Sequence, residues 1–591
     1  MKNLATKQRK SQTLLNGAMI LSIATMIVKV IGVIYKIPLS NMIGTVGRGY
    51  FDSAYSLYTP IYTISMAGLP VAVSKMVSQQ MALGRFRDVK QIYKVAKRLF
   101  LIMGVFGTLT MLILSYPYAS IAKAPNALPA ILVITPSIFF CCVMSSYRGY
   151  YNGLRNMTPT AVSQVFEAGG KLVFGLLCAR VVISYGMSRF NQGLTVFGQE
   201  AVTETDALSA IYPYAAAAAA VGVTLGTVVG TIYLVILNKL KGDKITKTEL
   251  SSSPAPEKAN IIAKKLIVFA IPVVASSLVF SITNLIDAIT VQNRLEYVIA
   301  NNLDYIKTIY ASVLQGVKDE DIKTFLYGAY SLSLDFRNLI PSITIPLGVS
   351  AIPALSAAWA VKSKEQIKIS VESVLRVTML IAMPCGIGMG VLAQPILAVF
   401  YGGGEAASGI SVAAPVLKAY GFTIFLIALS QPMTNMLQAL DKAKIPLVSL
   451  TIGAVVKVIA NYVFVAIPSI NVNGAIIGTI ACYAIVVIIN LVALIKISKV
   501  RINFLSVFIK PIICGILCGV GAYCAFGIFN SILPGASTIR NILVLGVSIG
   551  FGGIIYVVSI LLLKGLAKDD INMLPKGEKI VKILAKYGFI G

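Results

Sequence analysis

The chain contains a series of long apolar segments, and these limit its possible folds more than any other feature. Hydrophobic windows of about 20 or more residues recur along the 591 residues. A helix of that length, rising 1.5 Å per residue, crosses roughly 30 Å of hydrocarbon. Because 57% of the residues are hydrophobic and only 13% are charged, the interior of a soluble protein could not hold so much apolar surface. We therefore expect an all-α, polytopic membrane protein.

The apolar pattern predicts fourteen transmembrane helices. They lie near residues 14–40, 51–79, 99–122, 127–150, 158–184, 208–238, 261–290, 323–355, 372–400, 411–438, 445–468, 472–497, 504–530 and 538–564. Several exceed 25 residues, which indicates tilt or kinks. The first is too long for a cleaved signal peptide, and we expect it to remain in the protein.

The sequence also repeats itself. Three sets of residues carry the repeat: 54–57 (AYSL) with 329–332, 68–74 with 348–354, and Pro159 and Lys171 with Pro446 and Lys457. The offset changes only from 275 (329 − 54) to 287 (446 − 159). Transporters often consist of two such copies, so we expect two six-helix lobes. Since six is an even number, the copies enter from the same side and their pseudo-twofold axis lies along the membrane normal.

These patterns divide the chain into five parts. We expect an N-terminal lobe at residues 1–238, a cytoplasmic linker at 239–260, a C-terminal lobe at 261–498, two further helices within 499–565 and a cytoplasmic tail at 566–591. Between predicted helices seven and eight, residues 294–323 carry apolar side chains at helical spacing. This pattern predicts an amphipathic helix that lies on lipid or caps its own lobe, or that docks a partner.

The charge pattern gives the orientation. The net charge is +28, but Lys and Arg alternate from loop to loop and do not form one basic face, so we expect no nucleic-acid partner. Basic residues crowd both ends and the even-numbered loops, and both termini are therefore predicted to be cytoplasmic.

Chemistry on a substrate has no visible apparatus. The chain has no His, and its eight Cys lie almost wholly inside the apolar spans without a CxxC pair. No GxSxG, Walker A or HExxH sequence occurs. We therefore expect no metal site, no disulfide framework, no cofactor and no enzyme activity.

Four cationic side chains lie deep in the predicted helices. Lys29, Lys171, Arg337 and Lys457 are each about 18 to 23 Å from the start of their span at 1.5 Å per residue. A charge in hydrocarbon costs at least a few kcal/mol and is usually kept for function. Lys171 and Lys457 are repeat equivalents, and we expect them to face each other in a cavity that suits a phosphate or diphosphate.

Some deep charges have a plainer explanation. Glu167 is four residues before Lys171, and this pair could simply neutralise itself. Asp335 and Arg337 are two residues apart, about 200° around a helix, so they point apart unless the backbone is irregular there. Lys29 has no acidic residue three or four positions away, which makes it the best single candidate for a watery cavity.

Aromatic and acidic side chains complete the candidate set. Tyr55, Tyr58 and Tyr62 form a stripe that could stack on sugar rings, although ordinary helix packing explains it too. Asp52 and Asp287 lie near outer helix ends, where capping and gating are equally open. Gly and Pro within the spans, as at 68–70, 346–348 and Pro384, mark positions where helices can bend.

Two motifs make the chain recognisable. Residues 27–39 (IVKVIGVIYKIPL) and 68–75 (GLPVAVSK) resemble the stage V sporulation protein B and YtgP-like group of polysaccharide flippases. That group shares a superfamily with MATE exporters and MurJ-type lipid II flippases, the MOP superfamily. The turn from Asn152 through Arg155 to Pro159, echoed from Gln438 to Pro446, fits the resemblance, and we assign Arg155 a gating role.

The resemblance implies an activity. It implies movement of an undecaprenyl-diphosphate-linked sugar, such as lipid II, from the inner to the outer leaflet of the bacterial cytoplasmic membrane. Lys29 matches a cavity arginine of MurJ-type relatives, Arg337 lies within about a residue of another, and Tyr35 stands where a further arginine would be. The last two helices resemble the tail-binding groove of lipid flippases. We expect membrane lipids and cell-wall synthesis proteins as partners, a monomer, and coupling to the membrane potential, Na⁺ or H⁺.

Two other functions compete with this one. A MATE-like cation-coupled exporter of drugs or metabolites would need buried carboxylates without cations beside them, but Glu167 and Asp335 each have a basic neighbour. The other is a nontransporting scaffold that recruits cell-wall enzymes, and no sequence feature favours it. The substrate-binding candidates are therefore Lys29, Arg337, Lys171, Lys457, Asp335, Glu167, Tyr55 and Tyr62, with Asp52, Asp287 and Arg155 as gating candidates.

Overall fold

The structure is a computed structural model, and it describes residues 14–66, 68–243, 245–533, 535, 537–567 and 570. Helices make up most of this part of the chain, and its β structure is limited to one isolated bridge between Val196 and Gln199. The expected all-α fold class is confirmed.

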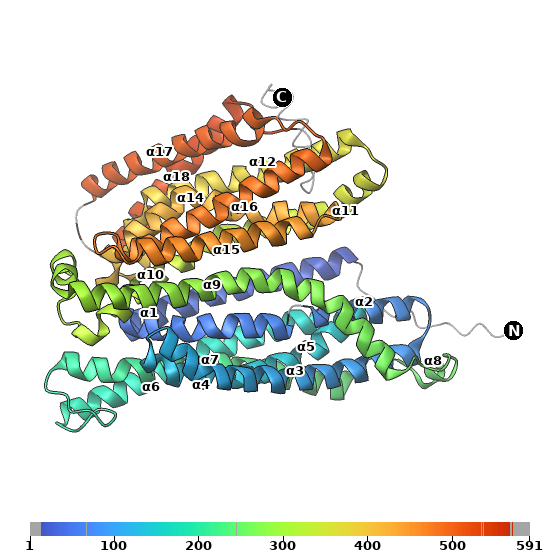
Figure 1. The fold of residues 1–591 in the computed structure, drawn as a ribbon, viewed down its shortest axis with the longest axis horizontal. Helices are drawn as coiled ribbons and strands as arrows, with labels where there is room; N and C mark the ends of the chain where they lie inside the picture. Colours follow the sequence, from blue (N-terminus) through green and yellow to red (C-terminus); the bar gives the residue numbers. More distant parts are fainter. Residues whose placement is uncertain are drawn as a thin grey trace. The chain divides into compact units, whose positions relative to one another are not determined.

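The chain forms two compact units, residues 1–289 (unit 1) and 290–591 (unit 2), divided within α9. Unit 1 contains α1 (Leu14–Met66), α2 (Leu69–Ala82), α3 (Phe86–Ile121), α4 (Leu128–Ile134), α5 (Pro136–Gly153), α6 (Thr158–Asn191), α7 (Glu204–Lys241), α8 (Lys247–Ser251) and the start of α9 (Ala259–Ile309). Unit 2 continues with α10 (Ile322–Arg337), α11 (Leu339–Ala360), α12 (Lys364–Val391), α13 (Ala393–Tyr401), α14 (Ile410–Ala439), α15 (Lys444–Phe464), α16 (Gly474–Ser498), α17 (Lys510–Ile532) and α18 (Thr538–Leu562). All of these helices except α13 carry their labels in Figure 1. The five predicted parts of the chain stay predictions.

Many of these helices are long and apolar enough to cross a membrane. Within the described residues, ten helical stretches meet that requirement, and one of them, Ile23–Ala82, covers two predicted spans. The chain is therefore a multi-pass membrane protein. The number fourteen and the orientation of the termini stay predictions.

The junction between the first two predicted spans, at residues 41–50, is a kink. Two helices meet there at Gly44, whose torsions are non-helical and whose φ of 66° lies in the left-handed region that favours glycine. The helix then breaks at Gly68, where an added Cβ would lie 2.9 Å from the Cα of Ala270 in α9. The break lies within residues 68–70, where the sequence predicts that the helix can bend, and an added side chain at Gly68 would not fit against α9.

The sequence repeat also appears as a repeated backbone turn. Arg155, between α5 and α6, has a φ of 55°, and Asp441, between α14 and α15, has a φ of 57°. In both turns the N–H of this residue donates to the carbonyl three residues earlier, at 3.0 and 3.1 Å. The following N–H donates to the carbonyl five residues before it, at 3.0 and 2.9 Å. Two matching left-handed helix ends support the repeat that the sequence predicts.

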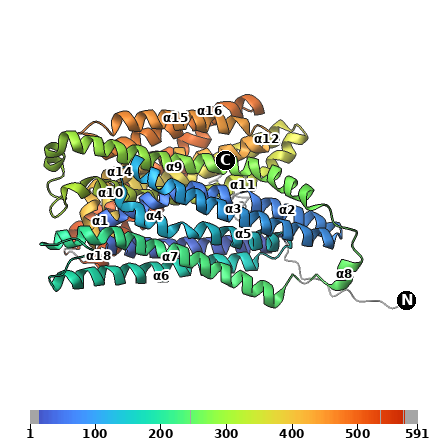
Figure 2. The same ribbon diagram turned by 60° about the horizontal axis from the view of Figure 1, so that its bottom comes forward.

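Each turn leads into a tightly packed helix pair. In unit 1, α6 and α7 lie along each other (Figure 1 and Figure 2), and a Cβ on Gly226 would lie 2.5 Å from the Glu167 carbonyl oxygen. In unit 2, α15 packs on α16, where a Cβ on Gly453 would lie 2.9 Å from the Cys482 carbonyl oxygen. Small residues let membrane helices approach closely. The repeat-related Lys171 and Lys457 therefore lie on equivalent helices, α6 and α15.

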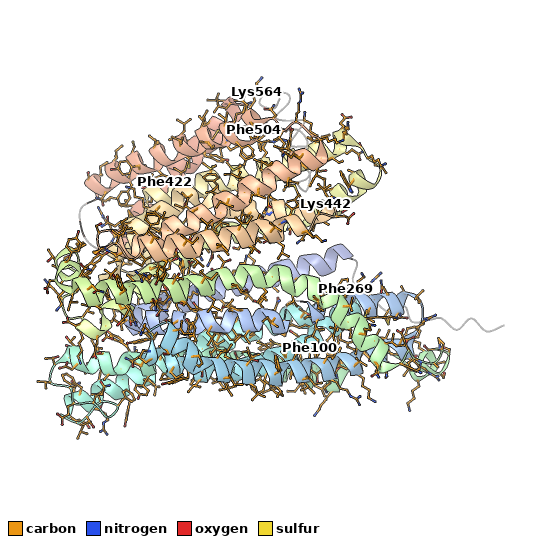
Figure 3. All side chains as sticks on the ribbon, viewed as in Figure 1. Phe100, Phe269, Phe422, Lys442, Phe504 and Lys564 are labelled. Carbon is orange, nitrogen blue, oxygen red and sulfur yellow. The ribbon has the colours of Figure 1, made fainter. Side chains whose placement is uncertain are left out.

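The predicted linker, residues 239–260, belongs to unit 1 and is held to α3 and α5 by polar contacts. Asp243 forms an ion pair with Lys90 of α3 and accepts a hydrogen bond from the Tyr150 hydroxyl at 2.6 Å. Burial alone would raise the pKa of Asp243, but the Lys90 ammonium, the Tyr150 hydroxyl and the Ile245 N–H together hold that pKa below its usual value. Further along, the Glu257 N–H donates to Asp88 at 2.7 Å. Phe100 and Phe269, labelled in Figure 3, belong to the apolar cluster beneath this region.

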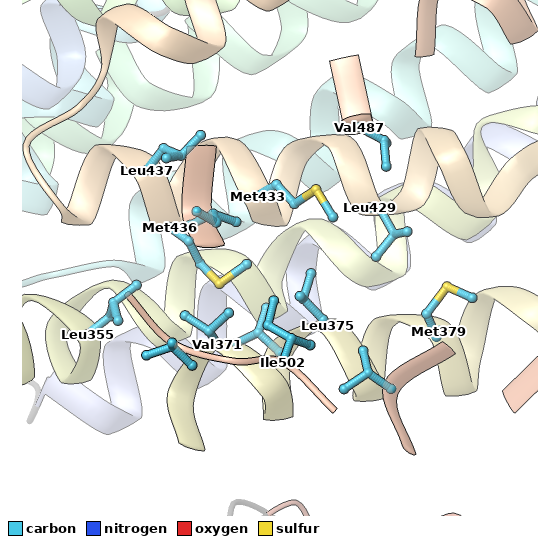
Figure 4. Packing of buried hydrophobic residues seen from close by; sticks show 14 of the residues in the cluster. Leu355, Val371, Leu375, Met379, Leu429, Met433, Met436, Leu437, Val487 and Ile502 are labelled. Atoms are coloured by element: carbon cyan, nitrogen blue, oxygen red, sulfur yellow. The ribbon is translucent and has the colours of Figure 1, made fainter. Parts of the chain in front are cut away.

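The core of unit 2 lies among α11, α12, α14 and α16. Figure 4 shows its packing, with Leu355, Val371, Leu375, Met379, Leu429, Met433, Met436, Leu437, Val487 and Ile502 labelled. The α17–α18 hairpin packs on α12, where a Cβ on Gly515 would lie 3.0 Å from the Met383 Cβ. A buried, bidentate ion pair ties the end of this hairpin to α12, with Arg376 Nε and Nη2 at 2.6 and 3.0 Å from the Asp570 carboxylate. Sequence reasoning did not find this pair.

Non-helical torsions at Asn302 divide α9 into two helices. A short helix at residues 303–309 therefore lies within the predicted amphipathic segment 294–323, and turns follow it. Ile306 is buried, and the Tyr310 hydroxyl donates to the Asn471 side chain at 2.7 Å. These contacts favour the expectation that the segment caps its own lobe.

Candidate substrate-contacting residues

Lys171 of α6 lies against an aromatic cage formed by Tyr35 and Tyr55 of α1. Its Nζ donates a hydrogen bond to the Tyr55 hydroxyl at 3.0 Å. The same ammonium lies 4.9 and 4.8 Å from the ring centroids of Tyr35 and Tyr55. Both distances are within the range of cation–π attraction. Tyr35 is itself fixed, because its buried hydroxyl donates to the Ala219 carbonyl at 3.1 Å.

Glu167 binds another cation. Arg148 of α5 places Nη2 at 2.9 Å from the Glu167 carboxylate and donates from Nε to the Ser163 hydroxyl at 2.9 Å. Among the described residues no ion pair joins Glu167 to Lys171. The neutralisation that the sequence left open is thus provided by Arg148. Arg148 lies close to the predicted end of its span at residue 150. A cation at a span end is common, because its side chain can reach the polar interface, so the sequence does not single it out.

The tyrosine stripe is present along α1. Ring centroids are 5.4 Å apart between Tyr55 and Tyr58, and 5.3 Å apart between Tyr58 and Tyr62. Tyr58 is buried beside Cys141, whereas Tyr55 and Tyr62 are half-buried. The partial exposure leaves both hydroxyl-bearing rings accessible, and sugar stacking stays a prediction.

Asp52 has a basic partner that sequence reasoning did not find. Arg48, one turn earlier on α1, forms an ion pair with Asp52 and is buried. Its Nη1 also donates to the Ser40 hydroxyl at 3.0 Å. The four-residue spacing is the signal that could have shown this pair in the sequence. A gating role for Asp52 stays a prediction.

The remaining candidates of unit 1 are not brought together with Lys171 by any contact in the described residues. Lys29 is exposed on α1, Arg155 is exposed at its left-handed turn, and Asp287 is buried on α9. Their predicted roles stay predictions.

In unit 2 the predicted deep cation Arg337 lies over an aromatic ring of α14. Arg337 is only 6% exposed, and its guanidinium carbon lies 5.3 Å from the Tyr420 ring centroid. The Tyr420 hydroxyl shares a 3.1 Å hydrogen bond with the Tyr330 hydroxyl. Asp335 instead accepts a hydrogen bond from Tyr401 of α13 at 3.2 Å. The two charges thus face different helices, as their spacing indicates.

Lys457 is almost inaccessible. Its side chain is 1% exposed, and it is among the largest fully buried side chains of the described chain. Contact with a substrate would therefore require α15 or its neighbours to rearrange. The predicted binding role of Lys457 stays a prediction.

Comparisons with known proteins show what this chain is similar to. A family model described as "Polysaccharide biosynthesis protein" matches residues 14–193, and one described as "Lipid II flippase MurJ" matches residues 338–543. Among curated proteins, the chain is 26% identical to the lipid II flippase MurJ of Bacillus subtilis (strain 168), over 80% of this chain and 81% of that one. It is 25% identical to stage V sporulation protein B of the same organism, over 95% and 98%.

Solved structures show the same fold. An inward-facing multidrug resistance MATE transporter of the MOP superfamily aligns with a TM-score of 0.58 and 16% identity, over 82% of this chain and 98% of that one. Lipid II flippase MurJ in an inward closed conformation aligns with a TM-score of 0.54 and 13% identity, over 92% and 98%. The homologues are flippases and transporters, not enzymes, and they support a flippase for a lipid-linked precursor. The sequence-based recognition is confirmed: the chain is a homologue of the flippase MurJ and of stage V sporulation protein B, with the fold of MOP-superfamily transporters.

Proposed function

We propose that this protein moves an undecaprenyl-diphosphate-linked sugar, lipid II or a related cell-wall or polysaccharide precursor, from the inner to the outer leaflet by alternating access. It acts as a transporter without a cofactor, and the membrane potential, Na⁺ or H⁺ supplies the driving force. Its homology to a lipid II flippase and to stage V sporulation protein B over most of its length supports this proposal.

The observation that carries the proposal is the set of partners around the Lys171 ammonium. The ammonium is half-buried in the aromatic cage, and in the described chain it has a hydroxyl but no carboxylate as partner. An intramembrane charge is costly and is usually kept for a ligand or a pathway. A cation that stays unneutralised suits an anionic headgroup, and a diphosphate offers several acceptor oxygens to it.

The other candidates take supporting roles. Lys29 is exposed and meets the diphosphate together with Lys171, whereas the rings of Tyr55 and Tyr62 contact the sugar. Arg337 and Asp335 are held by tyrosines and contribute once those bonds open. Lys457 contributes only after a rearrangement, because it is buried in the present conformation.

The test uses the full-length protein in proteoliposomes with fluorescent lipid II and an external quencher. The wild type should move the lipid, and Lys171→Met should slow the movement about tenfold, the equivalent of about 1.4 kcal/mol in the free energy of activation. Arg180→Met is the matched control, because Arg180 is on the same helix, nine residues or about 180° away, and is exposed.

Three results would count against the proposal. The first is a wild type that does not move lipid II, and the second is equal binding of lipid II, undecaprenyl phosphate and phosphatidylglycerol. The third is efflux of a cationic dye such as ethidium without lipid movement, which would favour the exporter function. Full activity of Lys171→Met would remove the role of Lys171 alone.

A further inference from the structure

Two cations in unit 1 compete for one carboxylate. Ser163, Glu167 and Lys171 follow one another at four-residue intervals on α6, so their side chains share one face of the helix. A Glu and a Lys at this spacing normally attract each other. In this structure the carboxylate of Glu167 is instead held by Arg148, which comes from α5.

The geometry explains why Arg148 holds the carboxylate. Its guanidinium bonds two successive turns of α6 at once, with Nη2 at Glu167 and Nε at Ser163, both at 2.9 Å. The planar fork of an arginine suits such a two-point contact better than an ammonium does. Lys171, one turn further along α6, turns to the Tyr55 hydroxyl and to the two rings of the aromatic cage. The three charged groups sum to +1, and the uncompensated charge is that of Lys171.

We propose that Arg148 is a positioning residue that sorts these charges: it binds Glu167 so that Lys171 stays unneutralised and available to an anionic phosphate headgroup. The identity of the ligand rests on the proposed function. Without Arg148, Glu167 would lose its partner in a half-buried environment, and Lys171 would be the nearest cation on the same helix face. The site would then lose its affinity for an anion although Lys171 itself is unchanged.

The experiment measures the binding of undecaprenyl diphosphate to the purified full-length protein, relative to the neutral alcohol undecaprenol with the same tail. Arg148→Gln should lower this preference about tenfold, as should Lys171→Met, since a charge-assisted bond to phosphate is lost in both. Arg148→Lys should keep part of the preference. In Arg148→Gln/Glu167→Gln the preference should return to within about threefold of the wild type, because the competing carboxylate is gone.

A double-mutant cycle separates charge sorting from a simple effect of net charge. If Lys171 is already neutralised in Arg148→Gln, adding Lys171→Met should cause no further loss. Additive losses would overturn the inference, and so would a wild-type preference in Arg148→Gln or a lack of rescue by Glu167→Gln.

Two further readouts make each outcome decisive. The unfolding midpoints of all variants show whether Arg148→Gln loses the diphosphate preference merely because the protein is destabilised. If Glu167→Gln restores the stability of Arg148→Gln but not its diphosphate preference, charge sorting is contradicted. A wild type that does not prefer undecaprenyl diphosphate over undecaprenol would instead contradict the proposed function itself.

Discussion

Lys171 and Lys457 occupy equivalent positions in the two repeats, yet their surroundings differ. Lys171 is half-buried, with its ammonium at the Tyr55 hydroxyl, whereas Lys457 is 1% exposed. Tyr330, the equivalent of Tyr55 (55 + 275 = 330), bonds to Tyr420 and not to a lysine. The accessible charge of one repeat has thus become an interior charge in the other. The two repeats thus keep the same residue type in different surroundings.

The positions that form the Arg337–Tyr420 pair in unit 2 are not the repeat equivalents of those that form the Lys171 pairs in unit 1. Arg337 lies over the Tyr420 ring, and its equivalent in unit 1 is Tyr62 (337 − 275 = 62). Conversely, Lys171 lies over rings from α1. Both units therefore place a predicted deep cation over an aromatic ring, Lys171 of α6 in unit 1 and Arg337 of α10 in unit 2. An asymmetric substrate, with a charged headgroup and a long tail, requires no equivalence between the repeats.

The largest effect should come from truncating the two lysines. Lys457→Ala removes a fully buried side chain and leaves a cavity, so we expect the free energy of unfolding to fall by about 3 kcal/mol. Lys171→Ala removes a half-buried side chain whose cation–π contacts are worth about 1 kcal/mol. Denaturant or thermal unfolding in detergent measures both. Equal losses for the two variants would mean that burial does not distinguish the repeats.

A smaller effect should separate the two equivalent tyrosines. Tyr55→Phe keeps the ring of the aromatic cage but removes the hydroxyl that orients Lys171, so the preference for undecaprenyl diphosphate over undecaprenol should fall about fivefold, about 1 kcal/mol. Tyr330→Phe breaks a buried hydroxyl pair and should instead reduce the free energy of unfolding by about 1 kcal/mol. Tighter diphosphate binding by Tyr55→Phe would show that this hydroxyl competes with the ligand, contrary to the orienting role.

Helix positions were the most predictable part of the fold. The spans predicted at 411–438 and 538–564 correspond to α14 (Ile410–Ala439) and α18 (Thr538–Leu562), because the bilayer fixes the length of an apolar run. The start of α3 at Phe86, 13 residues before the predicted 99, was missed since its first turns are polar and lie outside the apolar window. Hydropathy also cannot show that the first two spans meet in a single kink at Gly44 with no longer loop between them.

The site was predictable only residue by residue. Lys171 could be found because it interrupts an apolar run, but its partner Tyr55 is 116 residues away in sequence. Arg148 lies 19 residues from Glu167 on another helix, so the pairing depends on how α5 packs against α6. A single sequence shows which charges lie deep in the spans. It does not show which of them neutralise each other, and that is what determines the charge offered to a ligand.

The last comparison concerns the joints that follow α7 and α18. Asp243 pairs with Lys90, whose side chain is 43% exposed, whereas Asp570 pairs with the buried Arg376. Because the pKa of Asp243 is lowered in the folded protein, its contribution to linker docking is fully present above the usual carboxyl pKa of about 4. The contribution is lost as the pH falls through the lowered folded value, and it does not change between pH 5 and 8.

Hydrogen exchange of residues 245–253, corrected for the intrinsic rate at each pH, measures this contribution. Asp243→Asn should lower protection about fivefold at pH 6, about 1 kcal/mol for a solvent-screened pair, and should abolish the further loss of protection on acidification to pH 3. Asp304→Asn, at an exposed position in unit 2, is the matched control. The Asp570 joint should stay protected at pH 6 in both variants, because its ion pair is separate and buried. Unchanged protection in Asp243→Asn would mean that the linker is held by the Asp88 and Arg87 contacts alone, and the difference between the two joints would disappear.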